Sequence, residues 1–201
     1  MGDINSKVEL YHGTITPFNM IDPSKGWPYK DFGQGFYAGE DYNQAKGLTE
    51  NRKAGQLKMF AEGLIPNPQG LSIEAYEAQL VIYVYTYEFN RKAAHDLQAR
   101  GLLQMNIFKG ATLEWFDFVI HNRETEPTVH GYDIVIGPTA DDATSLVVSR
   151  YFAGRYGEVG YEQTKLKALK DFKAEKFGVQ YYFRNSLAVS TLRRVNEEVI
   201  V

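Results

Sequence analysis

The 201-residue sequence predicts a single mixed α+β domain. The clearest strand signal is the run 79–89, which is dense in β-branched and aromatic residues. Other runs, such as 112–121, space their apolar residues as a helix does. Strand-like and helix-like runs are interspersed along the chain, and no repeat, low-complexity stretch or linker divides it. We therefore expect one domain over residues 1–201.

The N-terminal part is expected to contain two strands, a long loop and a helix. Residues 7–11 alternate between polar and apolar side chains, as a half-buried strand does. Residues 15–34 contain several prolines and glycines, which predict a loop. Residues 35–38 predict a short strand. Asp41 is expected to cap a helix that runs into the fifties, because its carboxylate can accept hydrogen bonds from the first backbone N–H groups.

Helices and strands are expected to alternate through the rest of the chain. Asn90 is expected to cap a helix that ends near residue 100. Expected strands cover 102–108, 132–136 and 179–183, and expected helices cover 112–121, 142–152 and 161–176. A last helix is expected from Asn185 or Ser186, with Leu187, Leu192 and Val195 as its core residues.

The composition excludes several kinds of chemistry. The sequence has no cysteine, so disulfides, thiolate metal sites and a cysteine nucleophile are impossible, which suits a reducing cytosol. The four histidines share no metal-ligand spacing, and no metal is expected. The net charge of −3 gives no electrostatic reason to bind nucleic acid or an anionic membrane. No apolar run reaches the roughly 18 residues of a membrane span, and we expect a cytoplasmic protein without a membrane partner.

Two short segments contain the strongest functional signal. Residues 10–14 (Leu-Tyr-His-Gly-Thr) place His12 at the end of an expected strand, followed by a glycine. Residues 31–37 (Asp-Phe-Gly-Gln-Gly-Phe-Tyr) place Tyr37 on a strand that follows a glycine-rich loop. The Asp-Phe-Gly triplet is not a kinase motif, because the chain lacks the catalytic loop and the upstream lysine motif. Taken alone, His12 and Tyr37 are also compatible with a strand cap and a core tyrosine.

The two segments resemble the first two motifs of the ADP-ribosyltransferase superfamily, in the branch of diphtheria toxin and the poly(ADP-ribose) polymerases. More closely, the chain resembles an uncharacterised bacterial family assigned to that superfamily. The resemblance implies two small antiparallel sheets with flanking helices and an NAD cleft between them. The further segments behind the resemblance follow in the expected order: Gln44-Ala45, 114–119 with Asn122-Arg123, 132–138 with 140–142, and 180–183.

The resemblance implies a role for each candidate residue. His12 would hydrogen-bond the adenosine ribose, and Tyr37 would stack on the nicotinamide ring. Gly13 has no Cβ, so its backbone would approach the nicotinamide carboxamide. Gln180 stands where many relatives have a catalytic glutamate and would hold the 2′-hydroxyl of the nicotinamide ribose. The implied catalytic residues are Gln180, His12 and Tyr37, and the implied NAD-binding residues are His12, Gly13, Thr14, Gly35, Phe36, Tyr37 and Arg123.

The implied activity is transfer of ADP-ribose from NAD, a co-substrate, to a macromolecular acceptor, with release of nicotinamide. The implied setting is a bacterial or phage effector, or a toxin restrained by a small antitoxin protein. Two other functions stay open: an inactive NAD-fold binding module, and an NAD glycohydrolase that uses water as acceptor.

The amide at position 180 is the main departure from the family pattern. It can position the ribose, but it lacks the negative charge that favours an oxocarbenium-like transition state. From sequence alone, Gln180→Glu is therefore expected to preserve or raise NAD cleavage, and Glu175 is a rival carboxylate. A second departure is Leu48, near where some relatives have an aromatic residue; Tyr42 is an alternative for that role.

Overall fold

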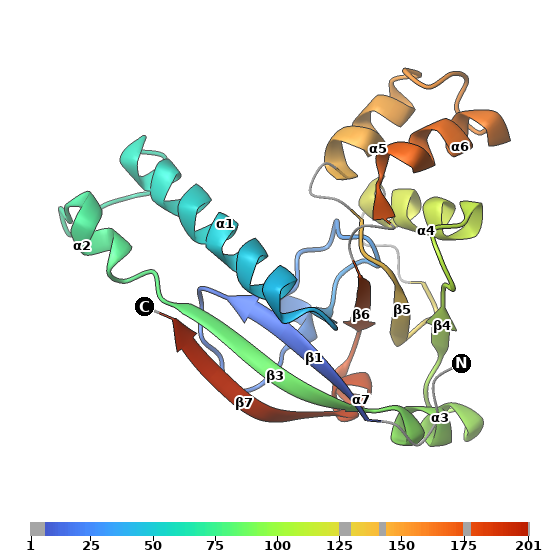
Figure 1. Cartoon of the computed structure of the whole chain (residues 1–201), viewed down its shortest axis with the longest axis horizontal. Coiled ribbons are helices and arrows are strands. Elements are labelled where there is room, and N and C mark those ends of the chain that lie inside the picture. The colour runs from blue at the N-terminus through green and yellow to red at the C-terminus, as the bar shows by residue number, and fades with distance from the viewer. Residues whose placement is uncertain (1–6, 125–129, 141–143, 175–177, 201) are drawn as a thin grey trace.

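The computed structural model describes residues 7–124, 130–140, 144–174 and 178–200. Within these ranges seven strands form one mixed sheet in the order β4-β5-β6-β2-β1-β3-β7 (Figure 1). The β4–β5 pair is parallel and the other pairs are antiparallel. The strands are β1 (Lys7–Thr14), β2 (Phe36–Gly39), β3 (Ile82–Asn90), β4 (Met105–Ile107), β5 (Ile134–Pro138), β6 (Val179–Phe183) and β7 (Leu192–Ile200).

The described strands thus form one continuous sheet and not the two small sheets that the resemblance implies. The join between β1 and β2 is short, because a single register pair, Tyr11 with Gly39, connects them. By contrast, β1 and β3 pair along the whole of β1. The expected α+β class is confirmed, and the sheet is most weakly connected between β1 and β2.

The helices lie in three groups around the sheet. In Figure 1, α1 runs across β1 with α2 at its far end, α4, α5 and α6 gather on the other side, and α3 and α7 lie at one end. None of the helices described is long and apolar enough to cross a membrane. The helices are α1 (Tyr42–Ala61), α2 (Ile73–Glu77), α3 (Arg91–Ala99), α4 (Leu113–Glu124), α5 (Thr144–Phe152), α6 (Glu162–Asp171) and α7 (Ser186–Val189), with a 3-10 turn at Pro23–Lys25.

Two helix N-caps expected from the sequence are confirmed. The Asp41 carboxylate accepts a hydrogen bond of 3.1 Å from the backbone N–H of Gln44 at the start of α1. The Asn90 side chain accepts one of 3.0 Å from the N–H of Ala93 at the start of α3. Both residues therefore fix where a helix begins after a strand.

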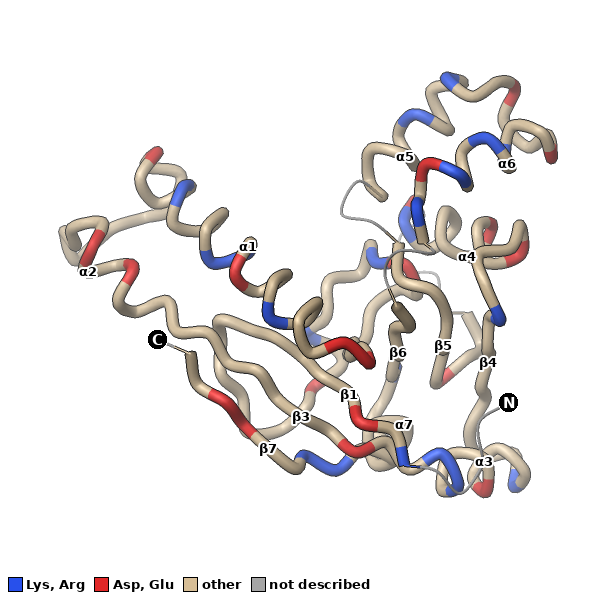
Figure 2. The backbone as a smooth tube through the Cα atoms, viewed as in Figure 1, with Lys and Arg blue, Asp and Glu red and all other residues tan. Residues whose placement is uncertain are grey.

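The sheet separates two buried apolar clusters. Neighbouring residues of β6 face opposite sides, so Tyr182 joins one cluster and Phe183 the other. On the Tyr182 side, Phe116 of α4 contacts the rings of Tyr151 and Phe172, each with centroids 5.3 Å apart. Much of the tyrosine and phenylalanine content of the chain is therefore used for the core. Acidic and basic residues are mixed over helices and strands alike (Figure 2).

The C-terminal segment differs from the sequence-based expectation. Helix α7 ends at Val189, and residues 192–200 form the edge strand β7 beside β3. Two of the three expected core residues are exposed, Leu187 by 39% and Val195 by 42%, while Leu192 is half-buried. The expected long helix is wrong because β3 offers backbone partners along its free edge, and pairing with them outweighs the local helical spacing.

Candidate functional site

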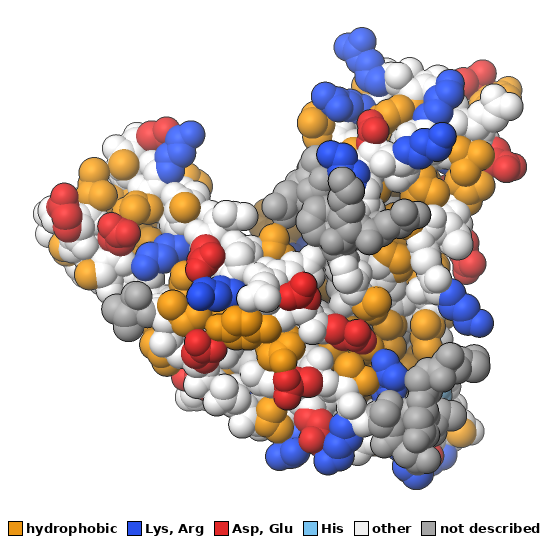
Figure 3. Space-filling view, in the orientation of Figure 1, with side chains coloured by type: hydrophobic (Ala, Val, Ile, Leu, Met, Phe, Trp, Pro, Cys, Tyr) orange, Lys and Arg blue, Asp and Glu red, His pale blue; other side chains and the backbone are white. Residues whose placement is uncertain are grey.

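A cleft of about 300 Å³ lies where β1, β2 and β6 meet the first half of α1. Its lining includes five of the residues singled out from the sequence, His12, Gly13, Tyr37, Arg123 and Gln180. The space-filling view shows the molecule hollowed between the α1 side and the α4–α6 side (Figure 3). Both sides contribute to the cleft, since α1 and α4 each provide lining residues. The fold thus brings together residues that are far apart in the chain.

A second cavity of about 680 Å³ adjoins this cleft. The two share four lining residues, His12, Lys30, Tyr37 and Arg52. The other expected NAD-binding residues line this second cavity: Thr14, Gly35 and Phe36. The cleft and the cavity therefore meet at these shared residues.

Tyr37 is fixed through its hydroxyl. The hydroxyl donates to the carbonyl of Gly33 at 2.7 Å and accepts from the N–H of Phe32 at 3.0 Å. Its ring packs edge-on against Tyr182, and the Lys30 ammonium lies 4.8 Å from the ring centroid. Burial, and next the nearby Asp31 carboxylate, raise the pKa of the Tyr37 hydroxyl well above its usual value. Tyr37 is therefore a neutral ring in the cleft wall that also holds the loop before it.

The imidazole of His12 is held in one tautomer. Its Nδ1 lies 2.6 Å from the Tyr37 carbonyl, which can only accept, so Nδ1 bears the proton. The ring also packs on Phe36 with centroids 4.6 Å apart. Burial lowers the pKa of His12 to about 4. At neutral pH the ring is therefore uncharged, and Nε2 is an acceptor with no hydrogen-bond partner among the described residues.

We expect His12 to make the protein sensitive to mild acid. The pKa of His12 falls from 6.5 to about 4 on folding, so the unfolded chain binds more protons between these values. Stability is therefore fully present above pH 6.5 and decreases as the pH falls toward 4. In His12→Gln this part of the pH dependence should disappear, as urea unfolding across the range would measure. The difference between variant and wild type at about pH 8 gives the combined loss of packing and of the hydrogen bond to Tyr37, without the protonation effect. An unchanged pH dependence in the variant would contradict this assignment.

Gly13 and Gly35 are required for packing. A Cβ on Gly13 would overlap the Thr49 hydroxyl and the Ala45 carbonyl of α1, so the helix lies directly on β1 at this point. A Cβ on Gly35 would overlap the ring of Tyr182. The resemblance gives Gly13 a different reason, close approach to a ligand. The structure shows a further reason: α1 packs so closely on Gly13 that no side chain fits there.

Asp31 lines the cleft and, like Lys30 and Arg52, was not among the site residues expected from the sequence. Its side chain is 8% exposed, and its two oxygens have different partners. Oδ1 accepts from Nε of Arg123 at 2.7 Å, and Oδ2 accepts from Nε2 of Gln180 at 2.8 Å. The aspartate is visible at the start of the 31–37 motif, but its partners are 92 and 149 residues away. Its position in the cleft therefore could not be predicted from the residues around it in the sequence.

Arg123 is consequently an ion-pair partner and not a free cation. Besides Asp31, its guanidinium donates to the Ser145 hydroxyl at 2.9 Å. Leu48, the second departure from the family pattern, lines the cleft. Tyr42 is not among the lining residues; it packs edge-on against Tyr11, which does line the cleft, and donates to Glu198 at 2.9 Å. Glu175 and the pair at 141–142 lie outside the described residues.

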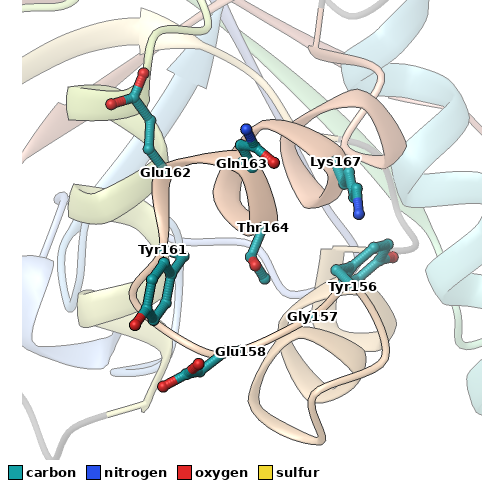
Figure 4. A pocket seen from close by; sticks show the side chains of 8 residues that line it. All are labelled: Tyr156, Gly157, Glu158, Tyr161, Glu162, Gln163, Thr164 and Lys167. Carbon is teal, nitrogen blue, oxygen red and sulfur yellow. The ribbon is translucent and has the colours of Figure 1, made fainter.

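Another hollow, of about 540 Å³, lies beside α6 and the loop that precedes it (Figure 4). Charges of both signs surround it, including Glu158, Glu162 and Lys167. None of its lining residues, which fall within 156–167, belongs to the motifs. The part of the chain that the structure describes also contains no group of three or more His, Asp or Glu side chains placed to hold a metal ion. The cleft is therefore the better candidate site.

The chain shows no significant similarity to a curated protein or to a solved structure. A family model described as "Protein of unknown function (DUF3990)" matches residues 8–193. This span includes both motifs and every residue of the cleft described above. The protein is therefore a member of the DUF3990 family, whose function is unknown.

Proposed function

We propose that this protein transfers ADP-ribose from NAD to a macromolecular acceptor and releases nicotinamide. The observation that carries the proposal is that His12, Tyr37 and Gln180, on β1, β2 and β6, line one cleft. These are the three residues that the resemblance to ADP-ribosyltransferases assigns to the reaction. The short join between β1 and β2 lies beside this cleft.

The positions of Lys30 and Arg52 favour a ligand with a negatively charged group between its two halves. Both residues line the cleft and the adjoining cavity, and so lie at their junction. Neither forms an ion pair with another described residue. Burial, and next the nearby Arg52, lower the pKa of Lys30 to about 8. A diphosphate between two nucleoside halves would relieve this repulsion between like charges.

The reaction would break the glycosidic bond of NAD, and three residues of the cleft would hold the groups on either side of that bond. The bond from C1′ of the ribose to the nicotinamide nitrogen breaks with its electron pair going to nicotinamide, which leaves neutral. The ribose gains oxocarbenium character, and a nucleophile of the acceptor then bonds to C1′ and loses its proton. Tyr37 would stack on the nicotinamide, His12 would accept from a ribose hydroxyl through Nε2, and Gln180 would hold the 2′-hydroxyl at the reacting sugar.

Calorimetry with NAD, combined with nicotinamide release over hours, tests the proposal. Release that depends on added lysate, with labelled ADP-ribose found on a macromolecule by mass spectrometry, is the expected result. Binding without release would favour an NAD-binding module, the second candidate, which the amide at position 180 supports. Release into water alone would identify a glycohydrolase. A chain that neither binds nor cleaves NAD would contradict all three.

We expect Tyr37→Ala to weaken NAD binding by about 1–3 kcal/mol, the usual range for losing an aromatic stack. Tyr37→Phe keeps the ring but removes the hydrogen bonds to Gly33 and Phe32, so it should retain most of the affinity. Calorimetry on the folded fraction of each variant measures the difference. Equal affinities in wild type and Tyr37→Ala would show that the ring serves the core and not the ligand.

A further inference from the structure

Asp31 and Gln180 form a hydrogen-bonded pair in the cleft wall, and their surroundings fix which way the amide of Gln180 faces. Nε2 of Gln180 lies 2.8 Å from Oδ2 of Asp31 and 3.1 Å from the carbonyl of Pro138. A carboxylate and a carbonyl only accept, so both hydrogens of the amide nitrogen are used. The remaining polar atom, Oε1, is the one with which Gln180 can accept a hydrogen bond from a hydroxyl in the cleft.

Asp31 is itself rigidly held. Arg123 neutralises and orients its Oδ1, and the Asn122 side chain donates to its backbone carbonyl at 3.3 Å. The next residues of the loop, Phe32 and Gly33, are bound by the Tyr37 hydroxyl. The carboxylate thus has little freedom to leave Gln180. The sheet neighbours of Gln180 are two glycines, Gly39 on β2 and Gly137 on β5, so neither places a side chain against the amide.

We infer that Asp31 is a positioning residue for the reaction at this cleft: it holds Gln180 with Oε1 available to the ribose 2′-hydroxyl and places a carboxylate directly behind that amide. This rests on the proposed function. The contact with the sugar is then made by Gln180, and Asp31, itself ion-paired to Arg123, acts only through that amide. A carboxylate in contact with the amide nitrogen polarises the amide and makes Oε1 a stronger acceptor.

Gln180→Glu is therefore expected to lower the rate of NAD cleavage, whereas the sequence alone predicts that it preserves or raises this rate. A carboxylate at position 180 would face the oxygens of Asp31 and Pro138 at hydrogen-bond distance, with no hydrogen to share between them. Asp31→Asn fails for a related reason, because asparagine has one acceptor oxygen, whereas Arg123 and Gln180 each donate to Asp31. Combining the two changes restores a matched pair, since the amide introduced at position 31 can donate to the carboxylate introduced at position 180.

The test compares nicotinamide release by wild type, Asp31→Asn, Gln180→Glu and the double variant. We expect each single change to lower kcat on the order of 100-fold, the scale for a misplaced catalytic contact, with KM for NAD changed less than about threefold. The double variant should regain part of kcat, because the match between positions 31 and 180 is restored while the Pro138 carbonyl still faces an acceptor. Asp117→Asn is the matched control, since this carboxylate is also ion-paired, to Lys165 at 2.7 Å, but lies outside the cleft lining. It should leave kcat unchanged.

Several results would overturn the inference. A kcat for Asp31→Asn equal to that of wild type would do so, as would a double variant no better than its worse parent. Gln180→Glu is decisive even where Asp31→Asn does not fold, because a higher kcat would favour charge at position 180 alone. The unfolding midpoints of the four proteins test the contact between positions 31 and 180 without NAD. Additive effects of the two changes on these midpoints would contradict the contact. A wild type that neither binds nor cleaves NAD overturns the proposed function, whereas active wild type with additive variants overturns only this inference.

Discussion

Arg123→Met is expected to lower the free energy of unfolding by about 3–5 kcal/mol, the cost of leaving a buried charge without its partner. The Asp31 carboxylate is 8% exposed and Arg123 is 19% exposed, so water compensates for the lost guanidinium only in part. Methionine keeps much of the arginine's apolar length and removes the charge. Urea unfolding at neutral pH, compared with wild type, measures the loss.

Lys165→Met is the matched control for this prediction. Lys165 pairs with Asp117, another carboxylate at 2.7 Å, but that carboxylate is 46% exposed. Water and salt screen such a pair, and the expected loss is below about 1 kcal/mol. Similar losses of unfolding free energy in the two variants would show that the Asp31 carboxylate is no less accessible to water than that of Asp117.

Gly13→Ala is expected to destabilise the fold by about 3 kcal/mol, at the upper end of the usual cost of overpacking. The new methyl group would overlap the backbone carbonyl of Ala45 as well as the Thr49 hydroxyl, so α1 itself must move. The backbone of a helix cannot move out of the way by rotating about one bond, as a flexible side chain can. Thermal and urea unfolding of the variant would measure the loss.

Gly47→Ala, within α1, is the control for the glycine prediction. A Cβ at Gly47 would meet no atom within 4 Å. Because alanine has the higher helix propensity, this change should stabilise the protein by about 0.5–1 kcal/mol. The two substitutions therefore have opposite expected signs. Destabilisation by both would point to a general intolerance of α1 and not to the contact at Gly13.

The parts of the fold that follow local rules could be predicted from the sequence. Asp41 and Asn90 cap helices because the donors they satisfy are within three residues of them. The strand at 179–183 is also where its pattern placed it. The meeting of His12 and Tyr37 across two strands was accessible only through the resemblance, because spacing alone does not pair distant strands.

The rest depended on contacts that a linear pattern does not contain. Residues 192–200 have spacing compatible with a helix, and the free edge of β3 decides that they form a strand. Asp31 has the same identity whether it is a solvated loop residue or a buried ion-pair partner, and Arg123 and Gln180 decide which. The continuity of the sheet likewise rests on one register pair between Tyr11 and Gly39.

The nine-residue edge strand β7 has a consequence for solubility. One side of its backbone has no strand beside it among the described residues, and such an edge can recruit a strand from another molecule and start aggregation. Four of its nine residues are charged, Arg193, Arg194, Glu197 and Glu198. Desolvating these side chains and placing like charges together would oppose the addition of a second copy. The charged residues of β7 thus allow it to remain an unpaired edge strand in water.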